Sequence, residues 1–255
     1  INRAGDDAAG LAISEHMRGQ IRGLNRASQN AQDGISMIET ADGYLSNVTG
    51  ILQRIRELAV QASNGIYVQT DRMQIQVEVS SLIDEIDRIA SHAQFNGLNM
   101  LTGKYSGAME GEQLHGSMWF HLGANMDQRK RVFIGTMTSG ALGLKSISED
   151  ESISLSTLEK ANFSIGKIDK ALTQVNKQRA DLGAYYRRLF YATKGLMISA
   201  ENTQSAESVI RDADMAKEMI SYIKGQVLSY STTLVLNRSN IIKNDSFLFL
   251  IKGNS

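Results

Sequence analysis

A seven-residue repeat of apolar side chains runs through residues 24–62 and limits what this chain can fold into. Mostly Asn, Gln, Arg, Asp, Glu and Ser fill the positions between them. The first (a) positions are Leu24, Ala31, Ile38, Leu45, Leu52 and Ala59, and the fourth (d) positions are Ala27, Gly34, Ala41, Val48, Ile55 and Ala62. This spacing is typical of a long helix with a narrow apolar seam, here about 58 Å long. Because the seam is too narrow to form a core alone, other long helices must cover it.

Composition supports long helices and excludes several classes of protein. The chain has no proline, which would break a helix interior, and no cysteine for a disulfide or a thiolate metal site. Its formal net charge is zero, without the basic excess of a nucleic-acid-binding protein. No run of about 18 apolar residues suggests a transmembrane helix. We therefore expect neither a nucleic-acid partner nor a membrane partner.

Three further helical segments accompany the repeat. The segment 1–14 reads as a short helix with an acidic first turn, and Gly19 and Gly23 predict a bend before the repeat. A second helix is expected from Thr70 to the Asn96-Gly97 pair, folded back antiparallel after a short connection. A third should begin at the Ser156-x-x-Glu159 capping box and, if unbroken, continue to residue 224.

The segment 97–155 changes character, with frequent glycines and two stretches rich in strand-forming residues. We expect residues 117–122 and 131–137 to pair as a β-hairpin through the polar turn 123–130. A lone hairpin is marginally stable in water, so one face should pack on the helices. The predicted fold is mainly α: a long antiparallel coiled-coil rod or bundle with a small β-hairpin region. Its expected parts are 1–96, the N-terminal helical part of the rod; 97–155, the hairpin and loops; 156–224, the C-terminal long helix; and 225–255, a divergent C-terminal segment.

Several segments, in order, resemble bacterial flagellin. They are residues 1–14, LQRIRELAVQASNG at 52–65, IDRIA at 86–90 with QFNG at 94–97, QRADLGA at 178–184 and SVIRDADMA at 208–216. SMWFHLGANMDQR at 117–129 and IGTM at 134–137 are similar to the periplasmic filament core protein of spirochaetes, which lacks large outer domains. The resemblance implies a structural subunit that self-assembles into the helical flagellar filament for motility. A non-flagellar coiled-coil secreted or adaptor protein is the alternative.

The resemblance also implies a location and partners. We expect a flagellum, periplasmic in a spirochaete and otherwise extracellular, built from a homopolymer of flagellin subunits. Flagellar cap, hook-junction, sheath and export-chaperone proteins are implied partners, and the vertebrate Toll-like flagellin receptor is another. In flagellins the two terminal segments pair as inner-core helices, so residues 225–255 are expected to lack their N-terminal mate. That segment is also bulkier than its counterpart in flagellins, which puts its packing in a polymer in question.

The interaction surface implied by the resemblance falls on Arg54, Leu58 and Glu78, flanked by Gln53, Glu57 and Gln61. Arg54, Leu58 and Gln61 share a helix face because they are spaced i, i+4, i+7. Spacing alone fits an ordinary solvated face with one apolar residue. With the motif intact, we predict a surface used first for subunit packing and then for the receptor.

No catalytic, cofactor or metal site is expected, and the chain is not expected to be an enzyme. His16, His92, His115 and His121 lack metal spacing, and His121 is expected to pack beside Trp119. The carboxylates Asp84, Glu85, Asp87, Asp212 and Asp214 read as solvated stripes rather than acid–base groups. Trp119 and Phe120 could mark a partner site, but a hairpin face buried on the bundle is favoured. Nucleophile and phosphate-binding motifs are absent.

Overall fold

The computed structural model describes the chain except residues 2, 108, 111–112, 115, 146–152 and 253–255; for 109–110, 113–114 and 244–252 it describes the backbone only. Its helices are α1 (Ala8–Ala62), α2 (Gln69–His92), α3 (Leu158–Arg211) and α4 (Met215–Lys252). Its strands form three antiparallel pairs: β1 (Gln94–Phe95) with β2 (Leu98–Asn99), β3 (Met109–Glu110) with β4 (Gln113–Leu114), and β5 (Met118–His121) with β6 (Arg129–Val132). The chain divides into two compact units, residues 16–205 and residues 1–15 with 206–255. The predicted mainly helical fold with a small hairpin region is confirmed.

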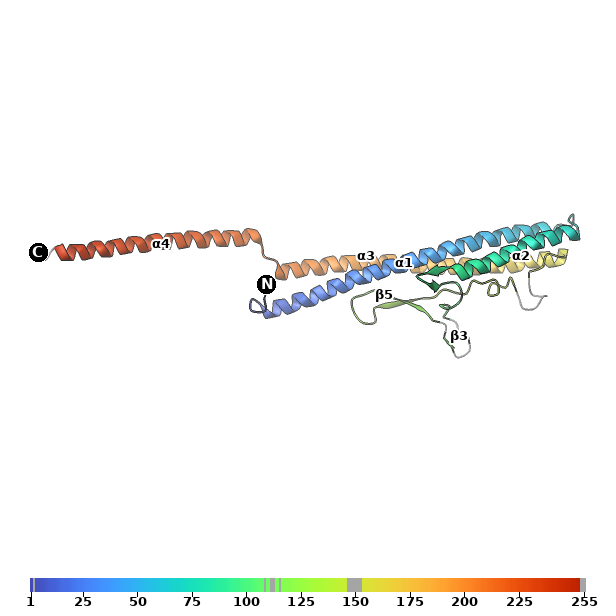
Figure 1. Ribbon diagram of the computed structural model, residues 1–255, viewed down its shortest axis with the longest axis horizontal. Coiled ribbons are helices and arrows are strands. Elements are labelled where there is room, and N and C mark those ends of the chain that lie inside the picture. The colour runs from blue at the N-terminus through green and yellow to red at the C-terminus, as the bar shows by residue number, and fades with distance from the viewer. Residues whose placement is uncertain (2, 108, 111–112, 115, 146–152, 253–255) are drawn as a thin grey trace. The chain divides into compact units, whose positions relative to one another are not determined.

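In the larger unit, α1 and α3 run antiparallel beside each other (Figure 1). Ion pairs join Arg56 to Asp169 at 2.7 Å and Asp42 to Arg179 at 2.8 Å. Both α1 residues occupy the e position, where charges flank a coiled-coil seam. Further along, Leu24 and Ala27 pack with Leu196 and Ala200. The residue numbers rise on one helix as they fall on the other, so one seam covers the other.

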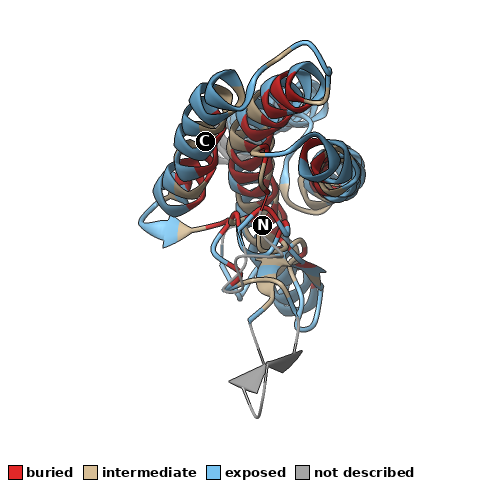
Figure 2. Cartoon of the chain, turned by 90° about the vertical axis from the view of Figure 1, so that its right-hand side faces the viewer, coloured by how far each residue is buried: buried red, intermediate tan, exposed pale blue. Residues whose placement is uncertain are grey.

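Every a and d position of the repeat is buried, as the heptad pattern predicts. Figure 2 shows the buried residues along the inward sides of the long helices. The heptad also has a third apolar row, at its g positions Met37, Tyr44, Ile51 and Leu58, which are buried or half-buried. This row widens the stripe enough for α1 to pack against α2 as well as α3.

The bend expected at Gly19 and Gly23 does not occur, because α1 continues unbroken from Ala8. A glycine inside a helix costs only about 1 kcal/mol relative to alanine, so a long helix can tolerate it. At Gly23 the missing side chain has a structural use. A Cβ there would lie 2.8 Å from the Cβ of Ala124, in the turn between β5 and β6.

Two helix ends also differ from the prediction. The Asn96-Gly97 pair does not end α2; both residues have positive φ (48° and 75°) and form the tight turn between β1 and β2. Asn-Gly is the strongest short hairpin signal, and here it outweighed the helix reading. α3 starts one residue later than expected, with the Thr157 hydroxyl accepting the backbone N–H of Lys160 at 3.3 Å.

The β5–β6 hairpin exists, but its second strand lies earlier than predicted, at Arg129–Val132. Its register pairs Met118 with Val132 and His121 with Arg129, so the turn is shorter. Residues 133–137 form no strand. Instead the backbone N–H groups of Ile134 and Met137 donate to carbonyls in the preceding irregular segment 101–105. Met118, Phe120 and Leu122 pack on the helical core, as expected for a lone hairpin.

In the smaller unit, α3 ends at Arg211 and does not continue to residue 224. Asp214 explains the break: its carboxylate accepts the backbone N–H groups of Ala216 and Lys217 and caps the N-terminus of α4. The Arg211 guanidinium binds Glu15 at 2.7 Å, and the Arg211 carbonyl accepts the amino group of Ile1. Apolar side chains on α4 are exposed as far as residue 243. Within the described residues, no helix is both long and apolar enough to cross a membrane.

Candidate interaction surface

The surface predicted at residues 53–61 and 78 joins the outer side of α1 to α2. Arg54 occupies a c position of the heptad and points away from the α1–α3 seam. Its Nε and Nη2 atoms donate to Glu78 Oε1 at 3.0 and 2.9 Å, and its Nη1 donates to Glu57 at 3.4 Å. The hydrogen bonds that Arg54 donates to Glu78 raise the pKa of Arg54 above its already high usual value. The structure thus brings three of the predicted residues together as one guanidinium shared by two carboxylates.

Leu58 is not on the outer face, contrary to the prediction. It is 2% exposed, in the g row on the side of α1 that faces α2. Spacing on one helix could not show this, because a second neighbouring helix decides which g positions are covered. Leu58 therefore offers no surface to a partner.

Gln53 and Gln61 are exposed on either side of Arg54, as predicted. The Gln61 side-chain amide donates to the hydroxyl of Tyr67 at 3.2 Å, in the connection between α1 and α2. The surface therefore has exposed amides and carboxylates around a single guanidinium. Chemically, it suits a polar partner that offers both donors and acceptors.

The carboxylates of α2 are less uniform than the predicted solvated stripe. Asp84 does contact Lys145, with both side chains well exposed. Glu85 binds Arg88 through two hydrogen bonds, and that interaction lowers the pKa of Glu85. Asp87 differs, because it accepts the backbone N–H and the hydroxyl of Ser139 at 2.8 and 2.6 Å. Asp87 thereby anchors the loop that follows β6 to α2.

A second polar anchor was missed because it lies inside the seam of α3. The buried Gln178 side chain accepts the N–H of Gly135 at 3.1 Å and donates to the carbonyl of Phe133 at 3.4 Å. The sequence signal for this anchor is that Gln178 falls in phase with the apolar seam of α3. A glutamine there needs partners, because an unpaired buried amide is costly.

The aromatic and histidine predictions for the hairpin need correction. Trp119 is 43% exposed on the outer strand face, held between Arg129 and Arg131 at 4.5 and 4.4 Å from its ring centre. His121 shares that exposed face and is not a packing residue. Strand alternation is the reason, because only Phe120 and Met118 point inward. His115 lies outside the described residues, and among those described no group of three or more His, Cys, Asp and Glu side chains could hold a metal ion.

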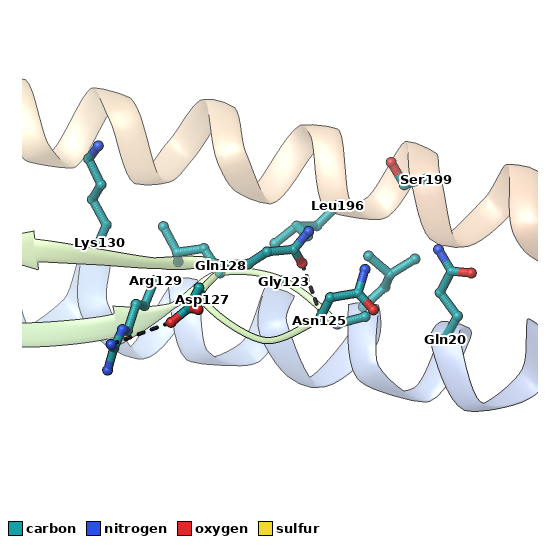
Figure 3. A pocket seen from close by; sticks show the side chains of 12 residues that line it. Gln20, Gly123, Asn125, Asp127, Gln128, Arg129, Lys130, Leu196 and Ser199 are labelled. Carbon is teal, nitrogen blue, oxygen red and sulfur yellow. Dashed lines mark hydrogen bonds and ion pairs between the residues drawn. The ribbon is translucent and has the colours of Figure 1, made fainter. Parts of the chain in front are cut away.

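A pocket of about 490 Å³ lies where the β5–β6 turn meets α1 and α3 (Figure 3). Gln20 and Leu24 of α1 and Leu196 and Ser199 of α3 line it from the helices. Across from them, the Gln128 side chain accepts the backbone N–H of Asn125 and shapes the turn. The pocket results from the packing of this turn on the helices, and its lining holds no nucleophile–base pair.

The geometry so far defines a class: a helical rod with a small hairpin region and polar outer surfaces, suited to structural assembly. Two family models match the chain, the bacterial flagellin N-terminal helical region over residues 1–106 and the bacterial flagellin C-terminal helical region over residues 165–245. The chain is 59% identical to the flagellar filament 31.3 kDa core protein of Treponema maltophilum, over 94% of this chain and 84% of that one. It is 57% identical to the flagellar filament core protein flaB2 of Brachyspira hyodysenteriae (99% and 88%) and 45% identical to flagellin of Bacillus subtilis (94% and 85%).

Solved structures agree with these relatives. Bacillus cereus flagellin matches with a TM-score of 0.53 and 27% identity, covering 66% of this chain and 88% of that chain. A putative flagellar hook-associated protein of Vibrio parahaemolyticus shares the fold, with a TM-score of 0.62 at 14% identity, over 81% of this chain and 99% of that one. The chain belongs to the bacterial flagellin family. It is a structural subunit of the flagellar filament, in a family of structural proteins rather than enzymes.

Proposed function

We propose that this chain builds the core of a spirochaete periplasmic flagellar filament, and that the surface around Arg54 and Glu78 is one of its contacts with neighbouring subunits. The observation that carries the contact is the exposed Arg54–Glu57–Glu78 cluster, held in place across two helices. A cluster already anchored between α1 and α2 loses little side-chain freedom when a neighbour binds. The Treponema and Brachyspira relatives support the location.

The contact is tested by seeded growth of filaments. The full chain is added to sheared filaments, and elongation is followed by electron microscopy for the unmodified chain, Arg54→Ala and Arg88→Ala. Arg88 is a matched control, because it is also an exposed arginine paired with a glutamate, here Glu85 within α2. We expect Arg54→Ala to slow elongation and Arg88→Ala to leave it unchanged. Equal rates for the two variants would remove the Arg54 surface from the assembly contacts.

The same surface is our proposed site for the vertebrate Toll-like flagellin receptor. Here the contact residues are Gln53, Arg54, Glu57, Gln61 and Glu78, and the buried Leu58 is not among them. Soluble chain should activate receptor-bearing cells, Arg54→Ala should weaken that activation, and Arg88→Ala should not. Absence of activation by the unmodified chain, or no effect of Arg54→Ala, would contradict this role.

Flagellar cap, hook-junction, sheath and export-chaperone proteins are proposed as further partners from the family resemblance alone. We also propose that the chain has no catalytic activity, since the carboxylates of α2 are engaged with Lys145, Arg88 and Ser139. Any turnover that disappears on substituting Asp84, Glu85 or Asp87 would contradict this.

A further inference from the structure

Within the larger unit, the described residues that pack on the α1–α3 pair do so from one side. Around a helix the heptad positions follow the order a, e, b, f, c, g, d, so g and d lie on one side of the seam and e and b on the other. α2 lies on the c and g side of α1, because Glu78 of α2 pairs with Arg54, a c residue. The hairpin uses the same side, because Gly34 (d) meets the Phe120 ring and the Asn30 amide (g) donates to the His121 carbonyl. On the e and b side, the groove that the described residues form is lined by α1 and α3 and by no residue of α2 or the hairpin.

That opposite side contains a groove between the two helices. It has a volume of about 490 Å³ and is lined by residues of α1 and α3 alone. Ile38, Leu182 and Tyr186 give it apolar walls, and Gly183 leaves one wall without a side chain. At its rim, the exposed Glu39 has no hydrogen-bonding or ionic partner among the described residues, whereas Asp42 is paired with Arg179. The groove is therefore apolar inside and carries an unpaired negative charge at its edge.

The β5–β6 hairpin carries complementary features. Met126 in its turn is 88% exposed, although it is a large apolar side chain. On the outer strand face Arg129 and Arg131 both stack on Trp119, and Arg129 also pairs with Asp127 at 3.4 Å. Stacking holds the guanidiniums in fixed positions while their N–H groups stay available. The hairpin thus offers an apolar tip beside two oriented positive charges.

We propose that the hairpin of one subunit docks into the α1–α3 groove of a second copy of this chain, with Met126 entering beside Gly183 and an arginine of the Trp119 stack pairing with Glu39. The two surfaces lie on opposite sides of the same helix pair, so they cannot meet within one molecule. A contact between two different surfaces of identical chains does not close on itself and continues into an open assembly. The inference rests on the proposed assembly of the chain and assigns one contact within it.

The chain contains no cysteine, so introduced thiols report the contact directly. Met126→Cys is combined with Gly183→Cys, and the control combines Met126→Cys with Gly166→Cys. Both glycines lie within α3 with no atom within 4 Å of an added Cβ, so both variants should fold. After growth on sheared seeds and treatment with a short thiol–thiol cross-linker, we expect a ladder of covalent oligomers from the first pair only.

A charge exchange provides a second readout. Arg131→Glu should raise the critical concentration for elongation about tenfold or more, because like charges then face each other at the contact. Adding Glu39→Arg to the same chain should return the critical concentration to that of the unmodified chain. Lys170→Glu, the same charge change placed on α3 away from the groove, should have little effect. Rescue by the double variant separates a lost contact from a lost fold.

The outcomes separate the two proposals. Filaments without a Gly183 ladder, equal ladders from both cysteine pairs, or no rescue by Glu39→Arg would overturn this contact and leave filament assembly standing. Failure of the unmodified chain to elongate seeds would overturn both.

Discussion

Gly34 offers a direct test of how the hairpin packs on the rod. A Cβ built on Gly34 would lie 2.9 Å from two ring atoms of Phe120 and 3.1 Å from Leu189 Cδ1. Within α1, Gly43 has no atom within 4 Å of its built Cβ and is exposed. The two glycines therefore share the same helix and differ only in what an added methyl group would meet.

The magnitudes follow from two opposing effects. Replacing glycine by alanine inside a helix gains about 1 kcal/mol of helix propensity, which Gly43→Ala should show in full. At Gly34 the same gain is opposed by overpacking, which costs about 1–3 kcal/mol in a filled core. We expect Gly34→Ala to be less stable than Gly43→Ala by about 1–3 kcal/mol.

The assay is urea unfolding followed by the helical circular dichroism signal, with both variants compared with the unmodified chain. If the two substitutions changed the free energy of unfolding equally, the close approach of Phe120 to α1 would be refuted. Phe120→Leu gives a second check, because removing the ring should relieve the penalty in the double variant. A double-mutant cycle without coupling between positions 34 and 120 would contradict the contact in the same way.

Three further outcomes are expected. Gln178→Ala should lower the free energy of unfolding by about 1–3 kcal/mol, because it leaves the Gly135 N–H and the Phe133 carbonyl unpaired. The same substitution at the exposed Gln174 should change the free energy of unfolding little, and equal denaturation midpoints for the two variants would contradict this. Since Arg88 lowers the pKa of Glu85, their pairing stabilises the fold above the ordinary glutamate pKa and loses its effect as pH falls through the lowered value. An NMR titration should therefore show a higher Glu85 midpoint in Arg88→Ala, and an unchanged midpoint would disprove the pairing. Amide hydrogen exchange should be faster in residues 16–31 of α1 than in residues 38–58, because fewer buried apolar side chains hold that end. Equal protection of the two segments would contradict this difference in packing.

The helical part of this fold could be predicted because its signals are local. The a and d positions of residues 24–62 repeat over several turns, and all are buried. The Asn96-Gly97 turn and the Asp214 cap were also visible in the sequence as local signals, but competing readings were preferred for them. At 96–97 the helix pattern extended up to the pair, and at 214 the third helix was expected to continue, if unbroken, to residue 224.

The site could be predicted only in part, because its composition depends on contacts between elements. Arg54 and Glu78 were placed together by resemblance, and the ion pair between them brings them together in the structure. The burial of Leu58 could not be predicted from α1 alone, because the g positions are covered only when α2 lies beside them. The anchoring roles of Asp87 and Gln178 depend on where the backbone of residues 133–139 runs, which no periodicity encodes.

The rod's core is uneven, and this has a consequence for assembly. From Ile38 to Leu58 the seam holds large side chains, the g row adds a second helix partner, and one continuous cluster results. Around residues 24–27 a separate, smaller cluster contains Leu24, Ala27, Leu196 and Ala200, with Ala124 of the hairpin turn packed against it. Alanine buries little apolar area, so this end gains less free energy from its own seam. The stability of this end therefore depends more on the packing of the hairpin turn. A neighbouring subunit that bound the hairpin would stabilise this end of the rod as well as the contact between subunits.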